Sequence, residues 1–170
     1  MTDRRLTRLA RLLLVVVAIA VVLTAVAAAT PAGSALVVED ADSGERLLST
    51  PVSEGTPVVL SYNHSVEKTP IHDVYVVRNG SLVMTRMEFQ SYGWGLPARA
   101  NVTRENGSFT FDPQGSYEEL YVKPGRTAGH RLRVGNRSYD LVALSNAEGV
   151  RLAITERSVL QNTLDTFNEH

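Results

Sequence analysis

After residue 34, short apolar stretches recur roughly every ten residues between turn-forming residues, which is the pattern of an antiparallel all-β domain. Asn79-Gly80, Asn106-Gly107 and Gly135-Asn136 predict tight hairpin turns, because these residues accept a positive φ. No long helical period interrupts the stretches, which argues against parallel βαβ units. We therefore predict an antiparallel meander that forms a small barrel or a two-sheet sandwich. The expected strands are Ala35–Ala41, Glu45–Ser49, Pro57–His64, His72–Arg78, Ser81–Gln90, Ser108–Asp112, Glu119–Val122, His130–Val134, Ser138–Ser145 and Val150–Thr155.

The N-terminal residues differ in composition from the rest of the chain. A head with several arginines is followed by an uncharged apolar run, residues 12–29. This order is typical of a segment that enters a membrane, with its positive charge kept on the cytoplasmic side. We predict that residues 1–33 are a signal peptide or membrane anchor and that the remainder is exported to the outer face of the cytoplasmic membrane. Ala27-Ala28-Ala29 fits a cleavage site, so removal and retention of the segment both stay open.

The rest of the chain, about 140 residues, has the size of one domain. We predict that residues 34–156 form the extracytoplasmic β-domain. Residues 157–170 are predicted to form a short C-terminal helix, because Leu160, Leu164 and Phe167 would share one helical stripe. Ser158 and Gln161 have the spacing of a capping box at its start.

The charge balance and the absence of cysteine narrow the possible functions. Acidic residues outnumber basic ones after residue 29, which argues against a nucleic-acid partner. With no cysteine, the chain has no disulfide, no thiolate metal site and no cysteine nucleophile. We expect no cofactor, and stability has to come from core packing.

Glycosylation sequons, Asn-x-Ser/Thr, fit an exported surface and occur at Asn63, Asn79, Asn101, Asn106 and Asn136. Modification of at least one is compatible with export. Asn79 and Asn106 are also the residues that tight hairpins require, so the structural and the glycosylation interpretations both stay open.

The segment NHSVEKTPIHDVYVVRNG, residues 63–80, places a charged loop between two strands. Because side chains alternate between the faces of a strand, His64 is predicted to be the last residue on the apolar side of its strand. A two-residue turn at Asn79-Gly80 would place Asp73 opposite Arg86, as a cross-strand ion pair on a solvated face. His72 then continues the predicted core face, which consists of Val74, Val76, Val83, Met87 and Phe89.

The strand that ends at Gln90 returns to the same end of the domain and is followed by SYGWGLP, residues 91–97. We predict that this loop meets HSVEKTP, residues 64–70, at one rim and forms a pocket for a small anion or a peptide segment. In the alternative, Tyr92 and Trp94 merely plug the mouth of the barrel. The candidate ligand-binding residues are His64, Ser65, Glu67, Lys68, Thr69, His72, Asp73, Ser91, Tyr92 and Trp94.

The same loop contains residue types that suit a metal site or a catalytic site. His64, Glu67 and His72 are suitable ligand types, but their spacing matches no established metal signature. Ser65 next to His64 makes no triad, because neighbours in a strand point to opposite faces, and a G-x-S-x-G elbow is absent from the sequence. No catalytic residue is predicted.

HSVEKTP followed by SYGWGLP resembles domain-of-unknown-function family 1850, a family of small exported proteins. AGHRLRVGNR, residues 128–137, and EGVRLAI, residues 148–154, extend the resemblance to roughly residues 35–155. Two departures stand out: His72-Asp73 replaces an expected acidic pair, and Trp94 replaces a smaller residue. The motif residues are His64, Ser65, Val66, Glu67, Lys68, Thr69 and Pro70, then Ser91, Tyr92, Gly93, Gly95, Leu96 and Pro97.

Members of this family are often encoded beside tripartite transporters whose solute receptor is of the TAXI class. The resemblance therefore implies an accessory binding module, with a TAXI-type receptor or the transporter permease as partner. Two alternatives stay open. One is a metal-assisted hydrolase that uses His64, Glu67 and His72, and the other is a structural envelope protein with no ligand.

Overall fold

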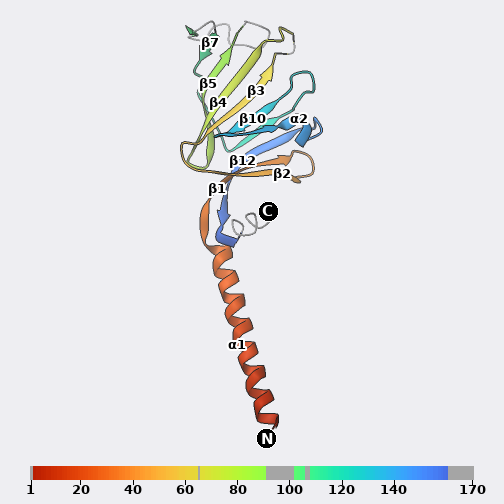
Figure 1. Ribbon diagram of the computed structural model, residues 1–170. Coiled ribbons are helices and arrows are strands. Elements are labelled where there is room, and N and C mark those ends of the chain that lie inside the picture. Colours follow the sequence, from red (N-terminus) through yellow and green to blue (C-terminus); the bar gives the residue numbers. More distant parts are fainter. Residues whose placement is uncertain (1, 65, 91–101, 106–107, 161–170) are drawn as a thin grey trace. The chain divides into compact units, whose positions relative to one another are not determined.

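The computed structural model describes the chain except for residues 1, 65, 91–101, 106–107 and 161–170 (Figure 1). The chain divides into two compact units. One consists of Ser34–Thr155, and the other of Met1–Gly33 together with Glu156–His170.

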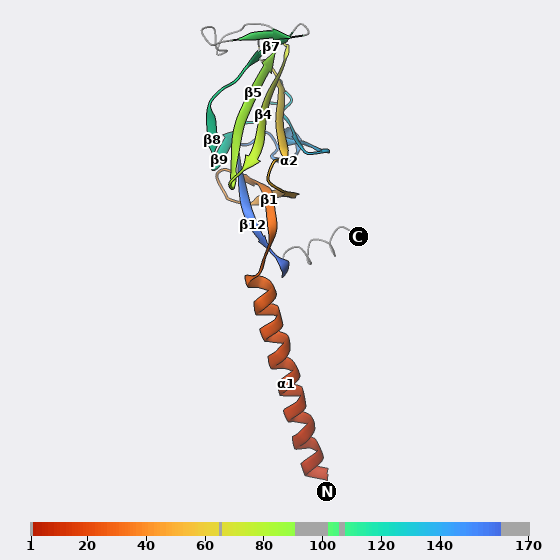
Figure 2. The same ribbon diagram turned by 90° about the vertical axis from the view of Figure 1, so that its left-hand side faces the viewer.

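The N-terminal unit contains the long helix α1, Thr2–Ala29 (Figure 2). Its segment Arg11–Ala29, 19 residues with a mean hydropathy of 3.1, is long and apolar enough to cross a membrane, and none of it is buried. The helix ends at Ala29, and the backbone N–H of the next residue, Thr30, donates to the Val26 carbonyl at 3.0 Å. Such a helix is compatible with either a signal sequence or an anchor.

The β-domain consists of two antiparallel sheets, as the turn pattern predicted. The smaller sheet has the strand order β2-β1-β12-β9, and the larger sheet has the order β11-β10-β3-β4-β5-β7-β6, with β8 pairing to β5. The strands are β1 Pro31–Asp40, β2 Arg46–Val52, β3 Pro57–Asn63, β4 Pro70–Arg78, β5 Ser81–Phe89, β6 Thr103–Glu105, β7 Ser108–Phe111, β8 Gly115–Tyr117, β9 Glu119–Val122, β10 Arg131–Val134, β11 Arg137–Asp140 and β12 Val150–Ser158.

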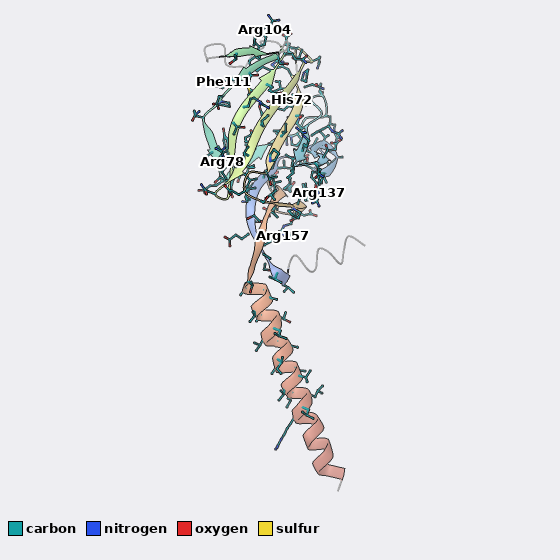
Figure 3. The ribbon with its side chains drawn as sticks, turned by 60° about the vertical axis from the view of Figure 1, so that its left-hand side comes forward. His72, Arg78, Arg104, Phe111, Arg137 and Arg157 are labelled. Carbon is teal, nitrogen blue, oxygen red and sulfur yellow. The ribbon has the colours of Figure 1, made fainter. Side chains whose placement is uncertain are left out.

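Of the two predicted architectures, the strand order makes the sandwich and not the closed barrel. One hydrophobic cluster joins the sheets: Leu36 and Leu152 come from the smaller sheet, and Leu60 and Leu132 from the larger one. The edge strands β2 and β11 are also linked, because Arg137 and Tyr139 both donate to the hydroxyl of buried Thr50, at 3.1 and 3.0 Å. Figure 3 labels Arg137 at this junction.

Several expected elements differ at their ends: β1 begins at Pro31 and not at Ala35, and β2 continues to Val52 and not to Ser49. The predicted strand Ser138–Ser145 stops at Asp140, whose carboxylate accepts the Ala143 N–H at 3.0 Å and caps the short helix α2, Leu141–Leu144. At the C-terminus, β12 extends through Ser158, and residues 159–160 are helical. Gln161, Leu164, Phe167 and the rest of the predicted C-terminal helix lie outside the described residues.

The hairpin between β4 and β5 confirms the predicted turn at Asn79-Gly80. Both residues have a positive φ, 49° and 72°, and Arg78 pairs with Ser81. Further along, the register shifts between Val74 and Tyr75, so that Val74 pairs with Arg86 and Thr85 is the extra residue of a β-bulge.

The bulge makes the predicted pairing of Asp73 with Arg86 wrong. Asp73 pairs with Met87, and the Arg86 guanidinium instead contacts the Glu88 carboxylate at 2.6 Å. The bulge also switches the alternation of β5, because Leu82 and Met84 before it, and Phe89 after it, are all buried.

The predicted core face of β4 is wrong as well. Ile71, Asp73, Tyr75 and Val77 are buried, whereas Val74 and Val76 are only partly buried. Both faces of β4 carry apolar residues, so the sequence pattern alone did not distinguish them. The face with Asp73 was predicted to be solvated because it carries a carboxylate. We call the buried side of the larger sheet its inner face and the side with His72 its outer face.

Candidate functional site

The loop between β3 and β4 is built around His64. The His64 ring is 8% exposed, and its Nδ1 accepts the backbone N–H groups of Val66 and Glu67, each at 3.2 Å. The His64 carbonyl accepts the Lys68 N–H at 3.0 Å, and its own N–H donates to the Thr69 carbonyl at 2.8 Å. His64 is buried on the apolar side as predicted, but it lies one residue beyond the end of β3, and its ring organises the loop backbone.

The tip of this loop is exposed. Val66, Glu67 and Lys68 face solvent, with Val66 69% exposed, and Lys68 has a φ of 57°. A lysine in the left-handed region is uncommon, so the hydrogen bonds around His64 hold the loop in an unfavourable conformation. Thr69 is partly buried, and Ser65 lies outside the described residues.

His72 lies on the outer face of the larger sheet, opposite to Asp73. Its Nδ1 is 2.9 Å from the hydroxyl of Ser61, its cross-strand partner on β3. Figure 3 shows His72 toward the end of the domain where Arg104 lies, while Arg78 lies toward the other end. Within the described part of the chain, no group of three His, Asp or Glu side chains could hold a metal ion, so the set His64, Glu67 and His72 gains no support.

The second predicted loop, residues 91–97, lies outside the described residues, and the strand before it is described. Phe89, the last residue of β5, pairs with Ile71, and Ile71 pairs with Tyr62 near the end of β3. The described ends of β3 and β5 therefore lie at the same end of one sheet, as predicted. Ser91, Tyr92 and Trp94 lie outside the described residues, and a shared rim pocket stays a prediction.

Asp73 is the residue whose environment departs most from the expectation. It is 7% exposed, and its pairing partners on the neighbouring strands are Leu60 and Met87. On its own strand, Ile71 and Tyr75 occupy the adjacent positions of the same face. A carboxylate in such apolar surroundings is costly unless its oxygens have partners.

Only part of this carboxylate is satisfied. Tyr62 lies on the same face of β3, and its phenol lowers the pKa of Asp73 as a hydrogen-bond donor. The Oδ1 oxygen of Asp73 is buried and has no hydrogen-bond partner among the described residues. Buried polar atoms of native proteins nearly always have partners, so this oxygen needs an explanation.

The burial of Asp73 changes its acidity and that of the neighbouring phenols. Burial raises the pKa of Asp73 from 3.8 to about 6, and the hydrogen bond from Tyr62 opposes the rise only in part. Burial, followed by the nearby charge of Asp73, raises the pKa of Tyr62 and that of Tyr75. Both tyrosines therefore stay neutral hydrogen-bond donors at physiological pH, while Asp73 titrates close to it.

Aromatic contacts extend the site on both sides of Asp73. The Tyr62 ring stacks on the His130 ring with centroids 4.9 Å apart, and the Tyr75 ring meets the edge of Tyr117 at 6.1 Å. His130 accepts the Gly125 N–H at Nδ1, and burial lowers its pKa. We call Tyr62, Asp73, Tyr75, Tyr117 and His130 the Asp73 cluster.

The Tyr117 ring packs closely against the backbone of Gly115. An added Cβ at Gly115 would lie 2.9 Å from the Tyr117 ring, so a side chain there would displace the ring. Gly115 and Tyr117 pair with Met84 and Leu82, which lie on the inner face of β5. The short strand β8 thus carries Tyr117 to the cluster.

Sequence reasoning found Asp73 but assigned it to the wrong face, and it missed Tyr75, Tyr117 and His130. The alternation of burial in β4 was present in the sequence as Ile71, Tyr75 and Val77, and only Asp73 interrupts this apolar and aromatic series. The alternation that placed His64 on the apolar side of its strand puts Tyr62 and Leu60 on that side as well, and Leu60 belongs to the hydrophobic core, against which Tyr62 packs. The pairing of Tyr117 with β5 had no signal in the sequence.

The fold and the cluster define a class of protein. It has an apolar N-terminal helix, followed in the chain by an antiparallel two-sheet β-domain with a buried carboxylate, that of Asp73. The family resemblance predicted from the sequence is confirmed, because residues 58–141 match the family "Domain of unknown function (DUF1850)". The matched segment runs from β3 to the first residue of α2 and includes the whole Asp73 cluster. Neither a curated protein nor a solved structure matches the chain significantly.

Proposed function

We propose that this chain is a membrane-anchored binding module on the outer face of the cytoplasmic membrane, and that it serves a tripartite solute transporter of the TAXI class. The apolar segment Arg11–Ala29, preceded by arginines, supports an anchor with its N-terminus in the cytoplasm. The β-domain follows this segment directly, because β1 begins at Pro31.

The observation that carries a binding role is the buried Oδ1 of Asp73, which has no partner among the described residues. A structural interior gains nothing from such an atom, because an apolar residue of similar size would avoid the desolvation cost. A carboxylate that awaits a partner is the usual arrangement of a binding site, in which a few polar groups lie among apolar and aromatic ones.

The transporter partner comes from the family resemblance. A TAXI-type receptor or the permease would meet the domain outside the membrane. The exposed tip formed by Val66, Glu67 and Lys68 offers a combination of one apolar and two charged side chains to such a partner.

The topology is tested first, with single cysteines in a chain that has none. A membrane-impermeant maleimide applied to intact cells should label Val66→Cys, because Val66 is exposed on the β-domain. The matched variant Thr2→Cys should be labelled only after the cells are opened. Labelling of Thr2→Cys but not Val66→Cys in intact cells would overturn the proposed location.

The partner is tested with the full-length chain purified from native membranes after mild cross-linking. We expect a TAXI-type receptor or permease among the captured proteins, identified by mass spectrometry. The control carries α1 fused to an unrelated β-domain. Equal recovery with this control, or no recovery of either transporter protein, would refute the accessory role.

A further inference from the structure

We propose that the Asp73 cluster binds an organic cation, a primary ammonium or guanidinium group, which donates a hydrogen bond to Oδ1 of Asp73 and lies against the rings of Tyr62 and Tyr75. This inference rests on the proposed role as a binding module, but not on the transporter partner. It also reverses the charge of the ligand that the loop composition suggested, a small anion.

The charge of the site is the first argument. The described residues next to Asp73 on the inner face are Leu60, Met87, Ile71 and Tyr75, none of which carries a positive charge. The nearest arginine along β5, Arg86, lies on the outer face and pairs with Glu88. An incoming cation would therefore find a carboxylate with an acceptor oxygen available, whereas an anion would be repelled.

The aromatic residues are the second argument. Electron-rich rings attract cations through their faces, most strongly where water is excluded. Tyr62 and Tyr75 lie on either side of Asp73 on the inner face: Tyr62 pairs with Ile71, two residues before Asp73, and Tyr75 follows two residues after it. Burial, and after it the charge of Asp73, raises the pKa of both phenols. Carboxylate and phenol rings together form the usual recognition site for ammonium groups.

A metal ion fits this site less well. Calcium and magnesium take six or more oxygen ligands. The described residues offer the single carboxylate of Asp73 here, and no group of three His, Asp or Glu side chains among them could hold a metal ion. A nitrogen-borne cation needs only one good acceptor and an aromatic wall. The chemistry present thus selects an organic cation.

The experiment uses the full-length chain in detergent, with n-butylammonium and n-butylguanidinium chloride as probes and n-pentanol as the neutral probe of similar size. Binding is followed by two-dimensional NMR at pH 7.5. We expect saturable shifts with at least one cation, with a Kd on the order of 1 mM for fragments of this size. n-Pentanol should bind at least about tenfold more weakly.

Variants assign the binding to the cluster. Asp73→Asn should weaken cation binding about tenfold or more, because it removes the charge and keeps the shape. Tyr75→Phe, which keeps the ring, should bind within about twofold of the original chain, and Tyr75→Leu should lose about threefold or more. The matched control is Glu88→Gln, an acid on the outer face of the same sheet, which should not change the affinity.

A second measurement needs no variant. Affinity for the cation should fall as the pH is lowered from 7.5 to 5, because protonation removes the charge of Asp73. Absence of saturable binding by either cation, equal binding by Asp73→Asn, or an affinity that does not depend on pH would each overturn the proposal. Capture of the transporter proteins by Asp73→Asn reports on the partner separately, so the failure of one proposal is distinguishable from the failure of the other.

Discussion

On the outer face of the larger sheet, the His72 ring contacts the Ser61 hydroxyl and Arg86 pairs with Glu88. On the inner face, Asp73 adjoins His72 in the chain, yet one of its oxygens is buried without a partner among the described residues. Polar groups that are satisfied and half-exposed contribute little and are replaceable. A buried carboxylate oxygen without a partner costs free energy, and perturbed groups of this kind cluster at functional sites of proteins.

We expect the largest difference between the two faces in the free energy of unfolding, when the adjacent β3 residues Leu60 and Ser61 are each replaced by alanine. Leu60→Ala should reduce the free energy of unfolding by about 2–5 kcal/mol, because Leu60 is buried in the core and leaves a cavity. Ser61→Ala removes the contact with His72 and should cost about 0.5–1.5 kcal/mol. Urea denaturation of both variants measures the difference, and equal losses would contradict the assignment of the faces.

Asp73→Asn should stabilise the β-domain at pH 7.5. The pKa of Asp73 in the folded state is about 6 against an ordinary value of 3.8, which corresponds to a gain on the order of 1–3 kcal/mol when the charge is removed. Glu88→Gln, on the outer face, should stay within about 0.5 kcal/mol of the original chain. A clear loss of stability in Asp73→Asn would mean that the chain itself supplies a partner to Oδ1.

The pH dependence of stability sharpens the same comparison. Because the pKa of Asp73 is raised on folding, the folded state holds a proton that the unfolded state has already lost, and stability should fall as the pH rises from 3.8 to about 6. The lowered pKa of His130 acts in the opposite direction, since its protonation favours the unfolded chain. The test is therefore the difference between the original chain and Asp73→Asn, measured as the urea midpoint at each pH. A difference that stays constant over this window would contradict the raised pKa.

The smallest effect is expected at the bulge. The Thr85 hydroxyl donates to the Val74 carbonyl at 3.2 Å, and Thr85→Val keeps the shape while removing this hydrogen bond. The variant should lose about 0.5–1 kcal/mol. Thermal unfolding measures it, with Thr110→Val on β7, where no side-chain hydrogen bond is described, as the control. No difference between the two would show that the bulge does not depend on this contact.

The comparison of the faces also shows where prediction from sequence worked. The Asn79-Gly80 hairpin was predicted because its chemistry is local: both residues accept a positive φ, and the pairing of Arg78 with Ser81 follows. The sequence also predicted the antiparallel strands, the burial of His64 and the family resemblance. Each of these depends on residues that are close together in the chain.

The inner face was mispredicted for two reasons. The bulge at Thr85 inserts one residue into β5, which changes the face of every residue beyond it, and no turn residue marks its position. Asp73 was assigned to solvent because carboxylates are rarely buried, whereas the structure buries it between Leu60 and Met87.

The sequence by itself determined an apolar N-terminal helix, an antiparallel β-domain and its hairpin turn, because these depend on periodicity and on residues close together in the chain. Only the tertiary structure decided which face of β4 is buried and which side chains surround Asp73. Burial is set by strands that are distant in sequence: Tyr117 reaches the cluster through β8, and His130 reaches Tyr62 just before β10. The cost of the interior carboxylate, and with it the proposed cation site, exists only once these segments have come together.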